Sequence, residues 1–98
     1  TRRLVLDNRR FAEEFIADHF PQVVATRSES TYLMWLDFRE TPFAKQPAGE
    51  LLRRARVALS EGALFGAGGE GFARINLGTS REVLSEALER ITKALREA

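Results

Sequence analysis

The sequence contains no cysteine, only one histidine and no long apolar segment. Without cysteine there is no disulfide framework, no thiol nucleophile and no thiolate metal site. The single histidine, His19, cannot build a histidine-based zinc site by itself. No apolar run approaches the roughly 20 residues that a membrane-spanning helix requires. We therefore expect no bound metal and no membrane partner.

A surplus of charge of one sign is also lacking, because 15 Lys and Arg residues are balanced by 14 Asp and Glu residues. Proteins that bind nucleic acid through its phosphates usually show a clear basic surplus, so no nucleic-acid partner is expected. Lysine itself is scarce, and only Lys45 and Lys93 are present. Chemistry that depends on an activated lysine must therefore use one of these two, or a lysine outside this chain.

What the sequence does contain is enough apolar material for one small globular domain. Hydrophobic residues make up 44% of the 98 residues, and about 100 residues is a common domain size. We predict a single domain over residues 1–98. The chain opens with Thr1, and its one methionine, Met34, is internal. We therefore expect either a trimmed start or a piece of a longer protein.

Periodicity and turn signals predict an α+β fold, with a small mixed or antiparallel sheet of about three strands packed against helices. Helices are expected over residues 1–19, over 50–57 and from a capping box of Thr79 and Glu82 onward. Strands are expected over residues 23–26, 31–38 and 72–77, with a polar turn at 27–30 and loops at 39–49 and 61–71. The strand at 31–38 is apolar on both faces except at Asp37, which indicates a buried central strand with Trp35 in the core.

The last strand alternates strictly and contains the main candidate for a binding residue. Ala73 and Ile75 point one way, toward the expected core, and Arg74 and Asn76 point the other way. A guanidinium carries a planar fork of donors that matches a carboxylate. Arg74 therefore indicates either an anion site or, as the alternative, a solvated face of the sheet.

Three further features have simpler interpretations. Asp37 needs a partner in its apolar strand, and Arg39, two residues on, is the candidate. His19 is expected to cap the C-terminus of the first helix.

The loop at 61–71 has five of the seven glycines, but it lacks the Lys-Ser/Thr ending of a phosphate-binding loop and precedes a strand. A loop that packs close to a ligand or to another backbone is the preferred interpretation.

Four segments in order resemble the fold type I pyridoxal-phosphate enzymes of the class I/II aminotransferase superfamily. These are TYLMWLDFR (residues 31–39), RARVALSEGALFG (54–66), GGEGFARINLGTSRE (68–82) and LSEALERI (84–91). Within that superfamily the sequence is most similar to the cystathionine β-lyases, the carbon–sulfur lyases of the MalY/PatB type. Glu61 stands where the family frequently has proline. The resemblance covers nearly the whole chain.

The resemblance implies that residues 1–98 are the small C-terminal domain of a larger enzyme. In this family the large domain supplies the lysine that forms a Schiff base with pyridoxal 5′-phosphate, in a Ser-x-x-Lys type of context. Neither Lys45 nor Lys93 has that context, so the isolated chain is expected to bind no cofactor, to contain no catalytic residue and to be inactive. Arg74 matches the family arginine that binds the substrate α-carboxylate.

For the parent enzyme the resemblance implies a cytoplasmic, homodimeric C–S β-lyase that acts on L-amino acids such as cystathionine. Its partners would be its own large domain and the amino-acid substrate. An aminotransferase built on the same scaffold is an open alternative, because both activities would use Arg74. A stand-alone amino-acid-binding or interaction module is an alternative from another class.

Overall fold

The computed structural model describes residues 2–28, 30–66 and 68–98, with residues 63 and 65 described as backbone only. Thr1, Glu29 and Ala67, which fall in the predicted first helix, polar turn and glycine-rich loop, lie outside the described residues. The elements in order are α1 (Arg2–His19), β1 (Val24–Arg27), β2 (Leu33–Asp37), α2 (Pro47–Ala55), β3 (Ser60–Glu61), the 3₁₀ turn η1 (Gly62–Phe65), β4 (Phe72–Asn76) and α3 (Arg81–Glu97). The predicted α+β class is confirmed.

The strands form one antiparallel sheet in the order β1-β2-β4-β3. Three of the four strands that the structure describes were predicted. The fourth, β3, has only two residues, Ser60 and Glu61, and pairs with the edge of β4. Two polar residues show no hydrophobic alternation, so the sequence could not predict this strand. It is a strand only because it pairs with β4.

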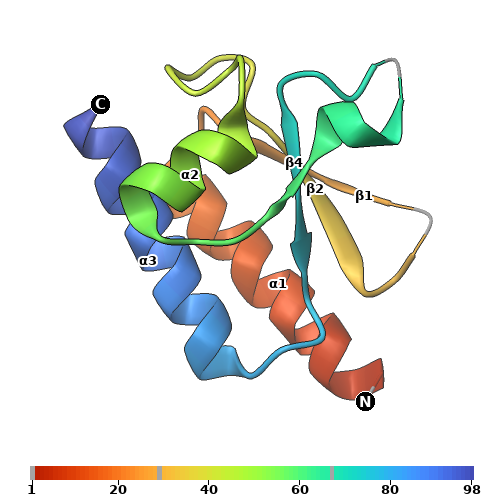
Figure 1. Cartoon of the computed structure of the whole chain (residues 1–98). Coiled ribbons are helices and arrows are strands. Elements are labelled where there is room, and N and C mark those ends of the chain that lie inside the picture. The colour runs from red at the N-terminus through yellow and green to blue at the C-terminus, as the bar shows by residue number, and fades with distance from the viewer. Residues whose placement is uncertain (1, 29, 67) are drawn as a thin grey trace.

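The three helices lie together on one side of the strands (Figure 1). The side chains that β2 and β4 direct to this side are almost completely buried: Met34, Leu36, Ala73 and Ile75. The predicted apolar stripe of α3 is buried as well, at Leu84, Leu88, Ile91 and Leu95. None of the helices in the described part of the chain is both long and apolar enough to cross a membrane.

The central strand β2 is buried on one face, not on both as predicted. Met34 and Leu36 are fully buried, whereas Leu33, Trp35 and Asp37 are only half-buried. The helices α1, α2 and α3 all lie on the same side of the sheet (Figure 1), so apolar residues on the other side keep part of their surface exposed. The prediction that Trp35 belongs to the core was therefore wrong, and Trp35 lies on the uncovered face.

The start of α3 also differs from the prediction. The N-cap is Ser80, whose hydroxyl accepts a hydrogen bond from the backbone N–H of Val83 at 3.2 Å. The capping box of Thr79 and Glu82 was therefore wrong by one residue. Two neighbouring hydroxyl residues both satisfy the sequence rule for a cap, and the backbone path from β4 decides which one is used.

The helix α2 begins three residues earlier than predicted, at Pro47. Proline is tolerated at a first helical position, because its missing N–H would have no partner within the helix. The side chain that caps this helix comes from β3: Glu61 Oε2 accepts hydrogen bonds from the N–H groups of Ala48, at 2.9 Å, and Gly49, at 3.3 Å. A carboxylate is favourable at the positive end of a helix. Glu61 therefore joins α2 to the edge of the sheet.

A buried polar residue of α1 fixes that helix against the end of the sheet. The side chain of Asn8 has no exposed surface. Its Nδ2 donates to the carbonyls of Leu77, at 2.9 Å, and Thr79, at 2.8 Å, and its Oδ1 accepts from Arg81 Nε at 3.1 Å. One side chain thus joins α1, the end of β4 and the first turn of α3. Nothing in the helical periodicity of residues 1–19 predicted this role.

Candidate functional site

The face of the sheet opposite the helices, which we call the open face, contains the predicted binding residue. It is formed by the alternate residues of β1, β2 and β4 that point away from the core: Val24, Thr26, Leu33, Trp35, Asp37, Phe72, Arg74 and Asn76. In the antiparallel register Trp35 lies opposite Arg74, and Asp37 lies opposite Phe72. Directly opposed residues of neighbouring strands share a face and touch, so the register determines which groups meet here.

Arg74 lies on this face as the strand alternation predicted. Its neighbours Ala73 and Ile75 are buried, at 0% and 4% exposure, and Arg74 itself is half-buried. The guanidinium carbon of Arg74 is 5.8 Å from the centroid of the Trp35 ring, which is within cation–π range. The cation therefore rests against an aromatic surface, where the effective dielectric constant is lower than in free solution.

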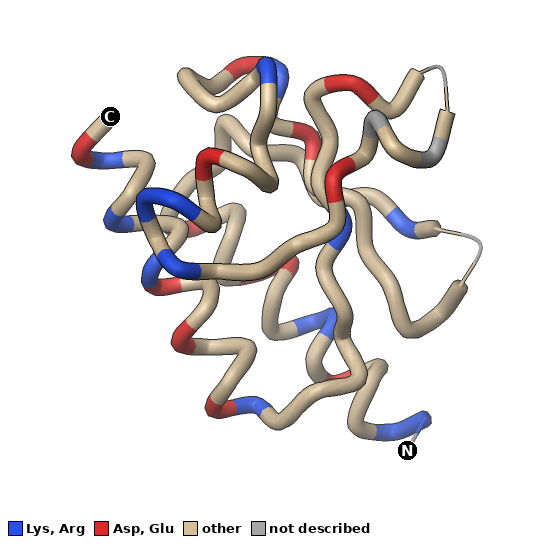
Figure 2. The backbone as a smooth tube through the Cα atoms, viewed as in Figure 1, with Lys and Arg blue, Asp and Glu red and all other residues tan. Residues whose placement is uncertain are grey.

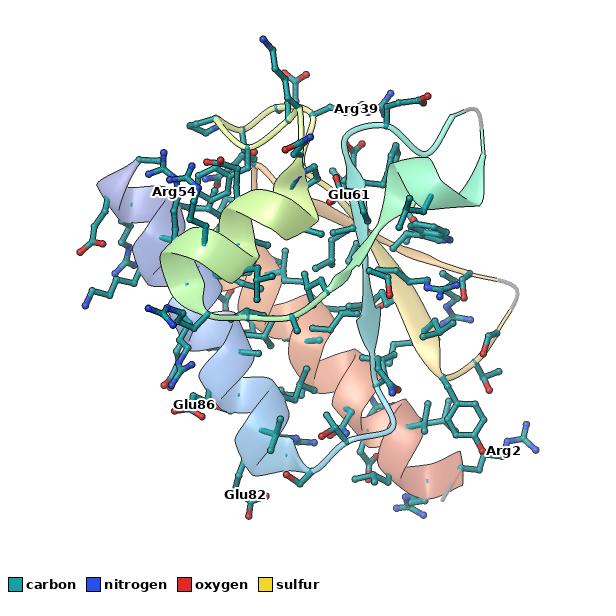
Figure 3. The ribbon with its side chains drawn as sticks, viewed as in Figure 1. Arg2, Arg39, Arg54, Glu61, Glu82 and Glu86 are labelled. Carbon is teal, nitrogen blue, oxygen red and sulfur yellow. The ribbon has the colours of Figure 1, made fainter. Side chains whose placement is uncertain are left out.

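A second arginine is held at another point of the open face, by the predicted partner Asp37. Arg39 Nε donates to Asp37 Oδ1 at 3.0 Å, and Arg39 Nη2 donates to Asp37 Oδ2 at 2.8 Å. The guanidinium carbon of Arg39 also lies 5.0 Å from the centroid of the Phe72 ring. Figure 3 labels Arg39 at the upper end of the sheet. The predicted pair is confirmed, and it is a two-point contact.

The two arginines are connected by a pair of aromatic rings. Phe72 and Trp35 meet edge to face, with ring centroids 6.3 Å apart and an interplanar angle of 90°. These contacts place four side chains in a row on the open face, in the spatial order Arg39, Phe72, Trp35 and Arg74. We call this set the arginine–aromatic row. Sequence reasoning missed Trp35 as a member of a site, because it assigned that residue to the core. The shared alternation of Trp35 with Asp37 was the signal that could have identified it.

The glycine-rich loop contributes to this arrangement at Gly71. Its φ of +87° is a conformation that side-chain-bearing residues rarely adopt, and a Cβ atom there would lie 2.5 Å from Arg39 Cγ. The Gly71 carbonyl accepts a hydrogen bond from Phe38 N–H at 2.8 Å. Glycine at this position thus allows the arginine side chain to cross close to the backbone. The loop was predicted to pack close to a ligand or to another backbone, and at Gly71 the nearest group is instead the side chain of Arg39.

The pKa of the Asp37 carboxyl is lowered below its ordinary value of 3.8, mainly by the side-chain hydrogen bonds from Arg39 and against the opposing effect of burial. A carboxyl with a lowered pKa in the folded state adds stability above about pH 4, and this contribution is lost as the pH falls through the folded-state pKa. We expect the free energy of unfolding of the wild type to fall more steeply below about pH 4 than that of Asp37→Asn. Urea unfolding at several pH values measures this difference. If the free energy of unfolding falls equally steeply with pH in both proteins, the pair of Asp37 and Arg39 does not stabilise the fold.

The other candidate residues lie outside the arginine–aromatic row. His19 is the last residue of α1, with Nδ1 3.1 Å from the Phe15 carbonyl and its ring stacked on Phe15 at 4.1 Å, so its predicted position at the helix end is confirmed. Lys45 and Lys93 are both exposed. No group of acidic or histidine side chains suited to a metal ion occurs within the residues that the structure describes. Acidic and basic residues are interspersed along the chain (Figure 2).

Exposure of both lysines bears on whether this chain could hold pyridoxal phosphate. A Schiff-base lysine is normally activated by desolvation or by a neighbouring cation in a closed pocket. Lys45 lies on an exposed loop and Lys93 lies on the exposed side of α3. The lysines of this chain therefore do not fit the cofactor.

The same fold occurs within enzymes that use this cofactor. Cystalysin from Treponema denticola, whose crystal structure contains pyridoxal 5′-phosphate, matches with a TM-score of 0.85 and 35% sequence identity. The match covers 97% of this chain and 24% of that one. The fold is therefore a domain type found in pyridoxal-phosphate-dependent enzymes.

Sequence comparison gives the particular group. The chain is 41% identical over 93 residues to the cystathionine β-lyase of Corynebacterium glutamicum, which covers 95% of this chain and 24% of the relative. It is also 35% identical over 78 residues to an aspartate aminotransferase of Pyrococcus horikoshii, covering 79% of this chain and 20% of that protein. No protein-family model matches the chain.

The resemblance to the MalY/PatB-type cystathionine β-lyases is thus confirmed, in both sequence and fold. The chain spans about a quarter of the length of the curated relatives that it matches. It corresponds to one part of these enzymes, and the remaining three quarters of their length has no counterpart in the 98 residues.

Proposed function

We propose that the chain is the small C-terminal domain of a larger, pyridoxal-phosphate-dependent enzyme, in which Arg74 binds the α-carboxylate of an L-amino acid. The observation that carries this proposal is the position of Arg74, half-buried on the open face and resting against Trp35 at 5.8 Å. The cofactor and its lysine belong to the large domain, because the lysines of this chain do not fit that role.

The chemistry of Arg74 suits a carboxylate ligand. A guanidinium offers two parallel N–H donors to a carboxylate, and such charge-assisted pairs gain strength where water is excluded. The rings of Trp35 and Phe72 form an apolar surface beside it. If the large domain covers the open face, the substrate would bind between two domains, which is a common place for ligand sites and for closure around a ligand.

For the reaction we propose α,β-elimination at the carbon–sulfur bond of an amino acid such as cystathionine, in a cytoplasmic homodimer. The similarity to cystathionine β-lyases at up to 41% identity supports this choice. Transamination is the second candidate, because an aspartate aminotransferase is 35% identical to the chain. A stand-alone amino-acid-binding or interaction module is the third. An upstream Ser-x-x-Lys segment in the parent gene would indicate an enzyme and not a module.

The proposal predicts that the isolated chain folds but does not bind the cofactor. We expect no stoichiometric internal-aldimine absorbance when the 98-residue chain is mixed with pyridoxal phosphate, and a stoichiometric band from the longer parent chain. Circular dichroism of the isolated chain checks that it is folded during the titration. A specific aldimine mapped to Lys45 or Lys93, accompanied by turnover, would contradict the proposal.

A further inference from the structure

The open face presents two guanidinium groups, and only one of them is needed to bind an α-carboxylate. Arg74 rests on Trp35 at one end of the arginine–aromatic row, and Arg39 rests on Phe72 at the other end. The edge-to-face contact of the two rings lies between them. A ligand that lies along this row would meet a cation, an apolar surface and a second cation.

Arg39 is both fixed and accessible. Asp37 accepts hydrogen bonds from Nε and Nη2 of Arg39, which orients the guanidinium and lowers the entropy cost of using it. The side chain of Asp37 is only 16% exposed, whereas that of Arg39 is 61% exposed. An incoming anion would therefore meet the guanidinium and not the carboxylate behind it. A guanidinium has five N–H donors, so donors are left for a ligand after Asp37 has taken its two.

We infer that Arg39 recognises a second anionic group of the substrate, at the end of its side chain. The inference rests on the proposed function, because it assumes that Arg74 holds the α-carboxylate. The substrate class is then an amino acid whose side chain has an apolar middle section, such as a thioether, and ends in a carboxylate. The apolar section would lie along Trp35 and Phe72, and Arg39 would discriminate against side chains that end in a neutral group.

A matched pair of substrates tests this inference in the parent enzyme. S-(2-carboxyethyl)-L-cysteine and S-propyl-L-cysteine have side chains of similar length, and only the first ends in a carboxylate. Formation of the keto acid, which elimination and transamination both yield, gives kcat and KM for each. The substrate ratio is kcat/KM for S-(2-carboxyethyl)-L-cysteine divided by kcat/KM for S-propyl-L-cysteine. We expect Arg39→Gln to lower this ratio about tenfold, because a charge-assisted hydrogen bond is lost for the carboxylated substrate only. The loss should lie mainly in KM for the carboxylated substrate.

Arg53→Gln is the matched control. Arg53 is exposed to a similar degree, 65%, and is paired with an acidic residue, Glu50, but it lies on α2 outside the row. We expect it to leave the substrate ratio unchanged.

The outcomes separate this inference from the proposed function. A lowered substrate ratio in Arg39→Gln supports the role of Arg39. An unchanged ratio would overturn it, whether or not the variant loses activity on both substrates. Both substrates have an α-carboxylate, so Arg74→Ala should impair both. If Arg74→Ala impairs neither, the proposed function fails, whatever Arg39→Gln does to the ratio.

Discussion

Replacing Arg74 with alanine in the parent enzyme is expected to lower kcat/KM for its amino-acid substrate by roughly 30-fold to several thousand-fold. Removal of one partner from a buried, hydrogen-bonded charge pair costs about 2–5 kcal/mol, largely because the other charge is left unpaired. Each 1.4 kcal/mol corresponds to about a tenfold change. Arg74→Lys should recover only part of the loss, because an ammonium is a point charge without the planar fork of donors.

The decisive measurement compares an amino acid with its decarboxylated amine on the wild type and on Arg74→Ala. The variant should lose much of its preference for the amino acid, since the amine has no carboxylate to lose. Both variants should fold, because Arg74 points away from the core side chains Ala73 and Ile75. If the substitution impairs amino acid and amine equally, Arg74 does not bind the carboxylate.

Replacing Asn8 with alanine is expected to lower the free energy of unfolding of the domain by about 2–4 kcal/mol. Asn8 is fully buried, and its side-chain amide donates to the carbonyls of Leu77 and Thr79. Alanine would leave both carbonyls without this donor, and a buried polar group that loses its partner costs about 1–3 kcal/mol. The contact of Asn8 with Arg81 Nε would be lost as well.

Urea unfolding of the isolated chain measures this effect, with Glu14→Ala as the control on the same helix. Glu14 is exposed, and surface substitutions usually change stability by less than about 0.5 kcal/mol. The variant Asn8→Asp should also be destabilised, because a carboxylate cannot donate to the two carbonyls. A change for Asn8→Ala no larger than that for Glu14→Ala would show that these hydrogen bonds add nothing to the stability of the fold.

Much of the fold could be predicted because its signals are local in sequence. The stripe of Leu84, Leu88, Ile91 and Leu95 repeats at helical spacing and is buried as predicted. The alternation of residues 72–77 correctly assigned Ala73 and Ile75 to the core and Arg74 to the other face. The pairing of Asp37 with Arg39 was predictable for the same reason, since the two residues are adjacent on one face of the chain. Periodicity of 2 or 3.6 residues is enough to establish such relations.

The sequence by itself determined the helices, the three main strands and the face on which Arg74 lies, since each depends on residues a few positions apart. Only the tertiary structure decided that the second face of β2 stays uncovered, because that depends on where the helices pack. It also decided the cap that Glu61 provides for α2 and the bonds from Asn8 to the end of β4, which join residues distant in sequence. The arginine–aromatic row has the same origin. The register of β2 against β4 sets Trp35 beside Arg74, and no local pattern specifies how two strands are aligned.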